Sequence, residues 1–166
     1  MKFWNRVHSR NKKHFSPKTK NVMNTKVLLA ALAGGVAMFL LGWLVWGMIL
    51  DPWYRTIMTP EATAATRNPE EMVMWALALS NLVYGLLLAL IFNRWANIST
   101  FKTGAIAGAV ISFLVALSFD FSLFAFMKMW TNSTILLVDP LANAAVGAVV
   151  GGVVGWVLGY GQRQAA

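Results

Sequence analysis

Residues 139–160 read DPLANAAVGAVVGGVVGWVLGY, and this stretch decides the fold class. Its glycines recur at every fourth position, at Gly147, Gly151, Gly155 and Gly159. In a helix exposed to water, each glycine would cost about 1 kcal/mol relative to alanine. In a bilayer, the same small residues allow helix backbones to approach one another closely. The stretch therefore predicts a packed transmembrane helix.

The composition of the whole chain points the same way. Of 166 residues, 58% are hydrophobic and only 12% are charged, whereas a soluble domain carries roughly 25% charged residues. Four apolar runs fit transmembrane spans of about 20 residues each and use most of the chain. We therefore expect an all-α fold, an integral membrane bundle of four transmembrane helices, as a single domain over residues 23–160. Residues 1–22 form a basic tail that we expect to be disordered, and residues 161–166 form a short C-terminal tail.

Local signals predict where several helices begin. Thr59-Pro60-Glu61 combines a capping side chain, a first-turn proline and an acid that matches the helix dipole, which predicts a short surface helix in the first outer loop. Asn68-Pro69-Glu70-Glu71 repeats this pattern and predicts the start of the second span. Asp139-Pro140 fits either the cap and first turn of the last span or a break within a longer helix. The predicted spans cover about 27–50, from that second start to 92, 101–126 and 139–160, and Ser99 or Thr100 can cap the third.

The net charge of +8 is concentrated in residues 1–22, which carry seven basic residues and no acid, so the remainder is only +1. We therefore expect no nucleic-acid binding by the body of the protein. Three interpretations of the tail stay open: a polybasic arm that touches anionic lipid, a disordered orientation signal, or residues upstream of a natural start at Met23. Lysine and arginine counts predict that both termini are cytoplasmic, by eleven against three with the N-terminal segment up to Lys26, which holds eight, and by three against three without that segment.

Several classes of chemistry find no support in the sequence. The chain has no cysteine, which excludes disulfides, thiolate metal sites and cysteine nucleophiles. Both histidines, His8 and His14, precede the first span. The sequence has no Gly-rich phosphate loop, zinc-protease, nucleophile-elbow or EF-hand motif. We expect no catalytic residues, no metal site and no cofactor.

Three predicted spans carry rows of small residues at every fourth position, and each row ends in a polar residue towards the outer side. We assign helix packing to Gly104, Gly108, Gly147, Gly151, Gly155 and Gly159. The polar residues are Asn81, Asp120 and Asn143, with Asp139 one further step along the last row. At 1.5 Å per residue, the first three lie very roughly 8–15 Å inside the outer ends of their helices. Their similar depth makes these four residues the candidate polar intramembrane site.

Asp120 is the most informative single residue of this set. A charge at membrane depth costs at least about 2.5–3.5 kcal/mol, so its side chain should face the bundle or water. One interpretation is a proton- or cation-responsive site. The structural interpretation is an aspartate that locks its helix to Asn81 or Asn143, or that pairs with Lys128 near the interface. Asn81 and Asn143 themselves fit hydrogen bonds between helices as readily as ligand contacts.

Several stretches resemble a family of small four-helix membrane proteins from Bacteroidetes and related bacteria, which belongs to a broader domain of unknown function. The stretches are Met23-Asn-Thr-Lys, Gly42-Trp-Leu-Val-Trp-Gly-Met-Ile-Leu, Trp95-Ala-Asn-Ile-Ser-Thr, Gly104-Ala-Ile-Ala-Gly-Ala, Ser118-Phe-Asp120 and the glycine-rich last span. The resemblance covers about residues 23–160 and does not include the basic tail. It implies a helical bundle in a bacterial inner membrane and implies no activity.

Two functions follow from these observations. The first is a non-enzymatic, multi-pass inner-membrane protein with a structural or accessory role, whose glycine faces pack within the bundle or against a partner. Its partners would be the lipid bilayer and either a second copy or another membrane protein. The alternative is a small oligomeric transporter or channel that uses an outward-facing polar site at Asp120, Asn81 and Asn143. A membrane enzyme acting on a lipid-soluble substrate is the least supported interpretation.

Overall fold

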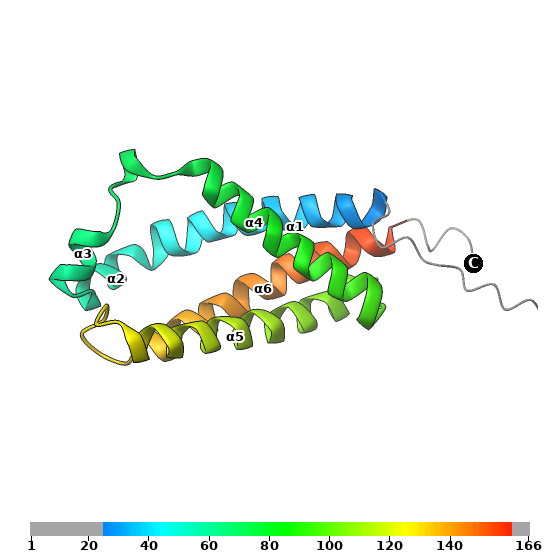
Figure 1. Ribbon diagram of the computed structural model, residues 1–166. Coiled ribbons are helices and arrows are strands. Elements are labelled where there is room, and N and C mark those ends of the chain that lie inside the picture. Colours follow the sequence, from blue (N-terminus) through cyan, green and yellow to red (C-terminus); the bar gives the residue numbers. More distant parts are fainter. Residues whose placement is uncertain (1–24, 161–166) are drawn as a thin grey trace, which may run out of the picture.

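The computed structural model describes residues 25–160, which form an all-α bundle (Figure 1). The basic tail and the last six residues lie outside the described part. Four long helical segments make up the bundle, and two of them end in a π-helical turn. In chain order the elements are α1 (Thr25–Leu44), η2 (Val45–Ile49), α2 (Asp51–Ile57), α3 (Pro60–Ala65), η3 (Pro69–Glu71), α4 (Met74–Leu90), η4 (Ile91–Ala96), α5 (Phe101–Phe126) and α6 (Ile135–Gly159).

The four long segments are the predicted transmembrane spans. They contain between 23 and 26 residues each, and about 20 apolar residues suffice to cross a bilayer. Large hydrophobic side chains are exposed along all four, which is the arrangement expected where lipid rather than water surrounds the bundle. The chain is therefore a multi-pass membrane protein with an all-α, four-helix fold, as the sequence predicts.

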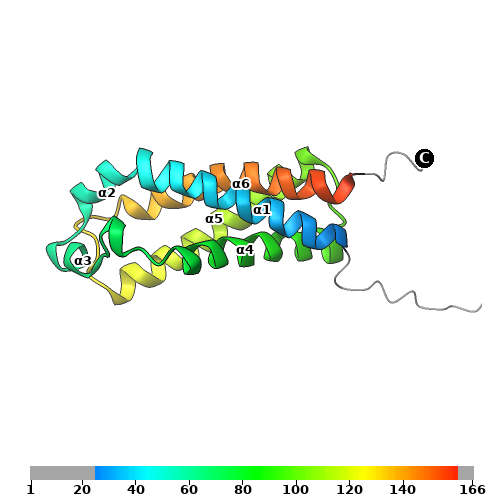
Figure 2. The ribbon, with the colours of Figure 1, turned by 90° about the horizontal axis from the view of Figure 1, so that it is seen from above.

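The two described ends lie at the same end of the bundle. The Lys26 ammonium group donates a hydrogen bond of 3.2 Å to the Tyr160 carbonyl oxygen. The short helices α2 and α3 and the 127–134 turn lie together at the opposite end (Figures 1 and 2). We call these the terminal end and the cap end of the bundle.

The hydrophobic core occupies the half of the bundle nearer the terminal end. It is built from one buried face each of α1, α4 with η4, and α6, and α5 adds only partly buried residues. Its fully or nearly fully buried members are Val27, Ala30, Ala31, Leu88, Ala89, Phe92, Val146, Val150, Val154 and Leu158. Figure 2 shows that α4 and α1 separate towards the cap end, where the first residues of α4 are exposed.

The α5–α6 pair is held by direct backbone contact. The buried residues of α5 are the predicted row and no others: Gly104, Gly108, Ser112, Ala116 and Asp120. A Cβ atom added to Gly108 would overlap the Gly147 carbonyl oxygen and would lie 2.8 Å from the Gly151 Cα atom. Gly155 and Gly159 similarly face the Thr100 and Ser99 carbonyl oxygens. Side chains at these positions would force the two helices apart.

A second close contact joins α1 to α4. A Cβ atom on Gly85 would overlap the Ala31 carbonyl oxygen and would lie 2.5 Å from the Gly35 nitrogen. A Cβ atom on Gly35 would lie 2.9 Å from the Leu82 Cα atom. This contact brings α4 against α1 near the middle of the two spans.

The helix starts differ from the predicted ones at two places, and two predicted caps are confirmed. The last helix begins at Ile135 rather than at 139, so Asp139-Pro140 lies inside a longer helix, as its second interpretation has it, but the helix continues through it without a break. Asn68-Pro69-Glu70-Glu71 forms a capping box on the 3₁₀ turn η3 and does not start the second span, because α4 begins only at Met74. The Thr59 and Thr100 side chains accept hydrogen bonds of 3.2 Å from Ala62 N and Thr103 N, as capping residues do.

The helix α2 is an element that the sequence analysis did not predict. Asp51-Pro52, which directly follows the predicted first span of about 27–50, starts this short helix, with the proline in its first turn. The π-helical turn η2 directly precedes it and changes the direction in which the following side chains point. This change places residues from the first outer connection against α6.

The contact between α5 and α6 can be tested with one added methyl group. Gly108→Ala should lower the free energy of unfolding by about 1–3 kcal/mol, because overpacking forces the backbones apart. Gly42→Ala is the matched control, since a Cβ atom there meets nothing within 4 Å, and it should be neutral or slightly stabilising. Unfolding in detergent by titration with SDS measures both values. Equal stability of the two variants would refute the packing assigned to Gly108.

Candidate functional site

Two connections that are far apart in sequence are hydrogen-bonded together at the cap end. Met58 and Trp130 form an isolated antiparallel bridge. The Thr59 backbone N–H donates to the Met129 carbonyl oxygen at 3.0 Å, and the Thr131 N–H donates to the Ile57 carbonyl oxygen at 2.7 Å. The segment after α2 is thereby attached to the turn between α5 and α6. This attachment positions α2 over the ends of those two helices.

Asp139 is the centre of the polar site beneath α2. The Trp46 indole N–H, from η2, donates to Oδ1 of Asp139 at 2.7 Å, and the Tyr54 hydroxyl donates to the same oxygen. The Asn143 side-chain amide donates to Oδ2 at 2.7 Å and to the Asp139 carbonyl oxygen at 3.0 Å. One carboxylate therefore accepts hydrogen bonds from three donors that come from three different elements.

Asp120 lies on α5 beside this carboxylate. Asp120 is only 9% exposed, and it belongs to the buried row of α5, two steps of four residues beyond Ser112, which faces Gly147 of α6. The Oδ2 atom of Asp120 is buried and has no hydrogen-bond donor among the residues that the structure describes. A buried polar atom without a partner is uncommon, because leaving it unpaired costs about 1–3 kcal/mol.

The ionisable side chains next to Asp139 are Tyr54 and Asp120. Burial, followed by the hydrogen bond to Asp139, raises the pKa of the Tyr54 phenol, so Tyr54 stays a neutral donor. Within residues 25–160 the ion pair is Arg55–Asp51, at 2.7 Å on the exposed surface of α2. The alternative pairing of Asp120 with Lys128 is therefore not formed.

The structure assembles three of the four predicted site residues. Asp120, Asp139 and Asn143 meet at the α5–α6 interface near the cap end. Asn81 does not join them, because its side-chain amide donates to the Leu77 carbonyl oxygen of its own helix at 2.7 Å. The predicted link from Asp120 to Asn81 is absent from the described hydrogen bonds.

Trp46 and Tyr54 are the site residues that the sequence analysis missed. Both lie near the outer end of the predicted first span, where tryptophan and tyrosine are commonly interfacial anchors. Their hydrogen bonds to Asp139 cross 93 and 85 positions of sequence. No local pattern reveals a pairing at that separation.

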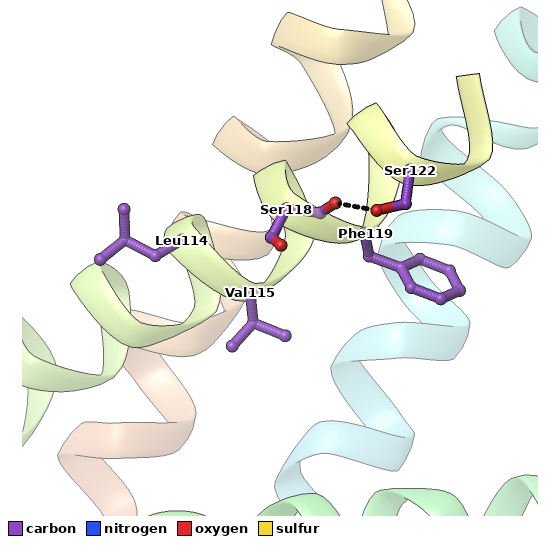
Figure 3. Close-up of a pocket in the computed structure, with 5 residues that line it drawn as sticks. All are labelled: Leu114, Val115, Ser118, Phe119 and Ser122. Atoms are coloured by element: carbon purple, nitrogen blue, oxygen red, sulfur yellow. Dashed lines mark hydrogen bonds between the residues drawn. The ribbon is translucent and has the colours of Figure 1, made fainter. Parts of the chain in front are cut away.

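Two other polar features lie outside this site. Tyr84 of α4 and Ser112 of α5 share a hydrogen bond two turns deeper in the bundle. A shallow groove on the outward face of α5 is lined by Leu114, Val115, Ser118, Phe119 and Ser122 (Figure 3). The Ser122 hydroxyl donates to the Ser118 carbonyl oxygen at 2.9 Å and is satisfied within its own helix.

Metal binding finds no support in this geometry. Over residues 25–160, no group of three or more His, Cys, Asp or Glu side chains is placed to hold a metal ion. The site therefore offers two carboxyl groups, a phenol, an indole and an amide. Such a set can bind and release a proton, and it can hold the cap, which consists of α2, α3 and the 127–134 turn, against the bundle.

Comparisons with known proteins leave the function to be argued from this geometry. The chain matches no protein-family model, no curated protein and no solved structure.

Tyr54 gives the first test of the site. Tyr54→Phe keeps the ring contact with Trp130, whose centroid lies 5.6 Å away, and removes the hydroxyl that donates to Asp139. The free energy of unfolding in detergent should fall by about 1.5–3 kcal/mol, the range for hydrogen bonds to charged groups. Tyr160→Phe is the control, because Tyr160 is exposed and its described hydrogen bond uses only the backbone. Equal stability of the two variants would contradict a stabilising hydrogen bond from Tyr54 to Asp139.

The same pair of variants carries a pH prediction. Because folding raises the pKa of Tyr54 above its ordinary value of about 10, its contribution is complete below that pH and is lost as the pH rises further. The wild type and Tyr160→Phe should therefore lose stability more steeply above about pH 10 than Tyr54→Phe does. Parallel pH profiles for all three proteins would contradict this.

Proposed function

We propose that this chain is a non-enzymatic, multi-pass protein of a bacterial inner (cytoplasmic) membrane, with a structural or accessory role. The backbone contact between α5 and α6 is the observation that carries the proposal. Glycine at positions 104, 108, 147 and 151 removes the side chains that would separate these helices. Much of the sequence is thus committed to holding two helices at one spacing, which suits a rigid membrane component.

The proposed orientation places both termini in the cytoplasm. Among the described residues, Lys26, Arg94 and Lys102 belong to the terminal end, and the same number of basic residues belong to the cap end. The seven basic residues of positions 1–22 decide the balance in favour of a cytoplasmic terminal end. The site beneath α2 then lies towards the outer surface of the membrane.

The partners we propose are the bilayer and a further membrane helix, from a second copy or from another protein. The outward face of α5 carries large apolar side chains that are all at least half exposed, namely Ile106, Val110, Leu114 and Phe121. Such a face suits lipid chains, and small neighbours such as Ala109 and Ser118 would also admit a helix.

A small transporter or channel, working as an oligomer, is the second candidate. The pairing of Asp120 with Asp139 favours it, because buried ionisable groups in membrane helices commonly mark ion pathways. Asn81 gives this candidate no support, since its amide bonds to its own helix.

Genetic complementation separates the two candidates. In a host with a measurable defect when the native gene is deleted, Asp120→Asn should restore function to the wild-type level under an accessory role. Gly108→Leu should restore much less, because a leucine cannot fit between α5 and α6, whereas Gly42→Leu should restore fully. A C-terminal reporter that is active only in the cytoplasm checks membrane level and orientation in every strain.

Loss of function in Asp120→Asn, with membrane level and reporter activity unchanged, would overturn the accessory role in favour of transport. An inactive reporter on a correctly inserted wild-type chain would overturn the proposed orientation.

A further inference from the structure

We propose that Asp120 and Asp139 together form a proton-binding site, in which one proton is shared between the two carboxyl groups. The inference concerns binding at equilibrium and rests on neither candidate function. It is carried by the register of two helices, by the donors around Asp139 and by the unpaired oxygen of Asp120.

The register of α5 and α6 brings the two acids together. Gly108 faces Gly151 and Gly147, and Ser112 faces Gly147, so each step of four residues along α5 matches a step of four backwards along α6. Two further steps from Ser112 reach Asp120 on α5, and two steps back from Gly147 reach Asp139 on α6. Asp120 and Asp139 therefore lie opposite each other across the α5–α6 contact.

The surrounding donors distinguish the roles of the two acids. Asp139 accepts from an indole N–H, a phenol O–H and an amide N–H, which together satisfy both of its oxygens as an ionised carboxylate would be satisfied. Asp120 has no donor at its buried Oδ2 atom. A proton on Asp120 that is donated to Asp139 provides this oxygen with a partner and avoids a second negative charge in a site of low dielectric constant.

The proton is the ligand that this chemistry selects. A metal cation needs several free oxygen ligands, whereas both Asp139 oxygens already accept hydrogen bonds and Asn143 presents its N–H₂ group rather than its carbonyl oxygen. Across residues 25–160 no third acid, histidine or cysteine completes a metal-binding cluster. The pair therefore binds one proton and retains one negative charge.

The groups facing the pair come from each neighbouring element. From α2 the pair meets the Tyr54 phenol, from η2 the Trp46 indole, and from α6 the Asn143 amide. On α4, Tyr84 bonds to Ser112 and lies deeper in the bundle. On α2, Arg55 is engaged by Asp51 on the exposed side. Among the described side chains no cation forms an ion pair with either acid, so nothing else compensates a second charge.

A proton bound here links the cap to the bundle. Asp139 holds α2 through Tyr54 and η2 through Trp46, while Asp120 holds α5 against Asp139. Loss of the shared proton leaves two like charges in contact beneath α2. We expect the cap to loosen when that happens.

Infrared difference spectroscopy of the full chain in lipid vesicles, during a pH titration, tests the proposal. The wild type should show the carbonyl band of a protonated carboxylic acid, and that band should disappear in one step as the pH rises. Asp120→Asn should lose the band and its titration step, whereas Asp51→Asn, which alters an exposed acid, should keep both. A wild-type chain without such a band, or an Asp120→Asn variant that retains it, would overturn the proposal.

Thermal unfolding in detergent supplies a second readout that remains valid if the spectra of Asp120→Asn are altered by misfolding. The asparagine amide can donate to Asp139 as a protonated aspartic acid does, so Asp120→Asn should fold and should lack the loss of melting temperature that accompanies proton release. Tyr54→Phe should retain the loss of melting temperature at raised pH, which would show that this loss does not come from titration of the phenol. Stabilisation of the wild type by added Na⁺ at fixed pH, with disappearance of the acid band, would overturn a proton site in favour of a cation site.

Discussion

The structure depends on the contact between the backbones of α5 and α6. This contact is possible only because glycine occupies the facing positions: at Gly108 and Gly151, each helix leaves space that a methyl group on the other would fill. Hydrophobic burial cannot hold helices together in lipid as it does in water, since lipid chains are as apolar as leucine. Close packing between the helices therefore supplies much of the attraction, and it fixes the register at the same time.

The polar site follows from that register. Two steps of four residues beyond Ser112 place Asp120 opposite Asp139, so the last turns of α5 and the first turns of α6 lie beneath α2. Burying two acids near each other is costly, and Trp46, Tyr54 and Asn143 offset this by donating hydrogen bonds to Asp139. Backbone hydrogen bonds between the 58–59 and 129–131 segments also hold the cap in place. Packing, site and cap are consequently parts of one arrangement.

Local sequence patterns predicted the four spans and the buried row of α5, because apolar length and a spacing of four are properties of the helix itself. The same reasoning identified Asp120, Asp139 and Asn143 as residues of interest. It failed where the outcome depends on which helices meet. Asn81 lies on α4, which packs through Gly85 against α1, so its row never reaches Asp120. Asp-Pro commonly starts a helix, yet here α6 continues through it from Ile135.

The absence of cysteine from the chain makes the register directly measurable by introduced cysteine pairs. Because four residues forward on α5 match four residues back on α6, position 116 faces position 143. Position 120 lies one helical turn away from position 143. Oxidation of the full chain in membranes should therefore cross-link Ala116→Cys/Asn143→Cys readily and Asp120→Cys/Asn143→Cys poorly. Preferential cross-linking of the second pair, or equal yields for both, would contradict the register and the acid pair that depends on it.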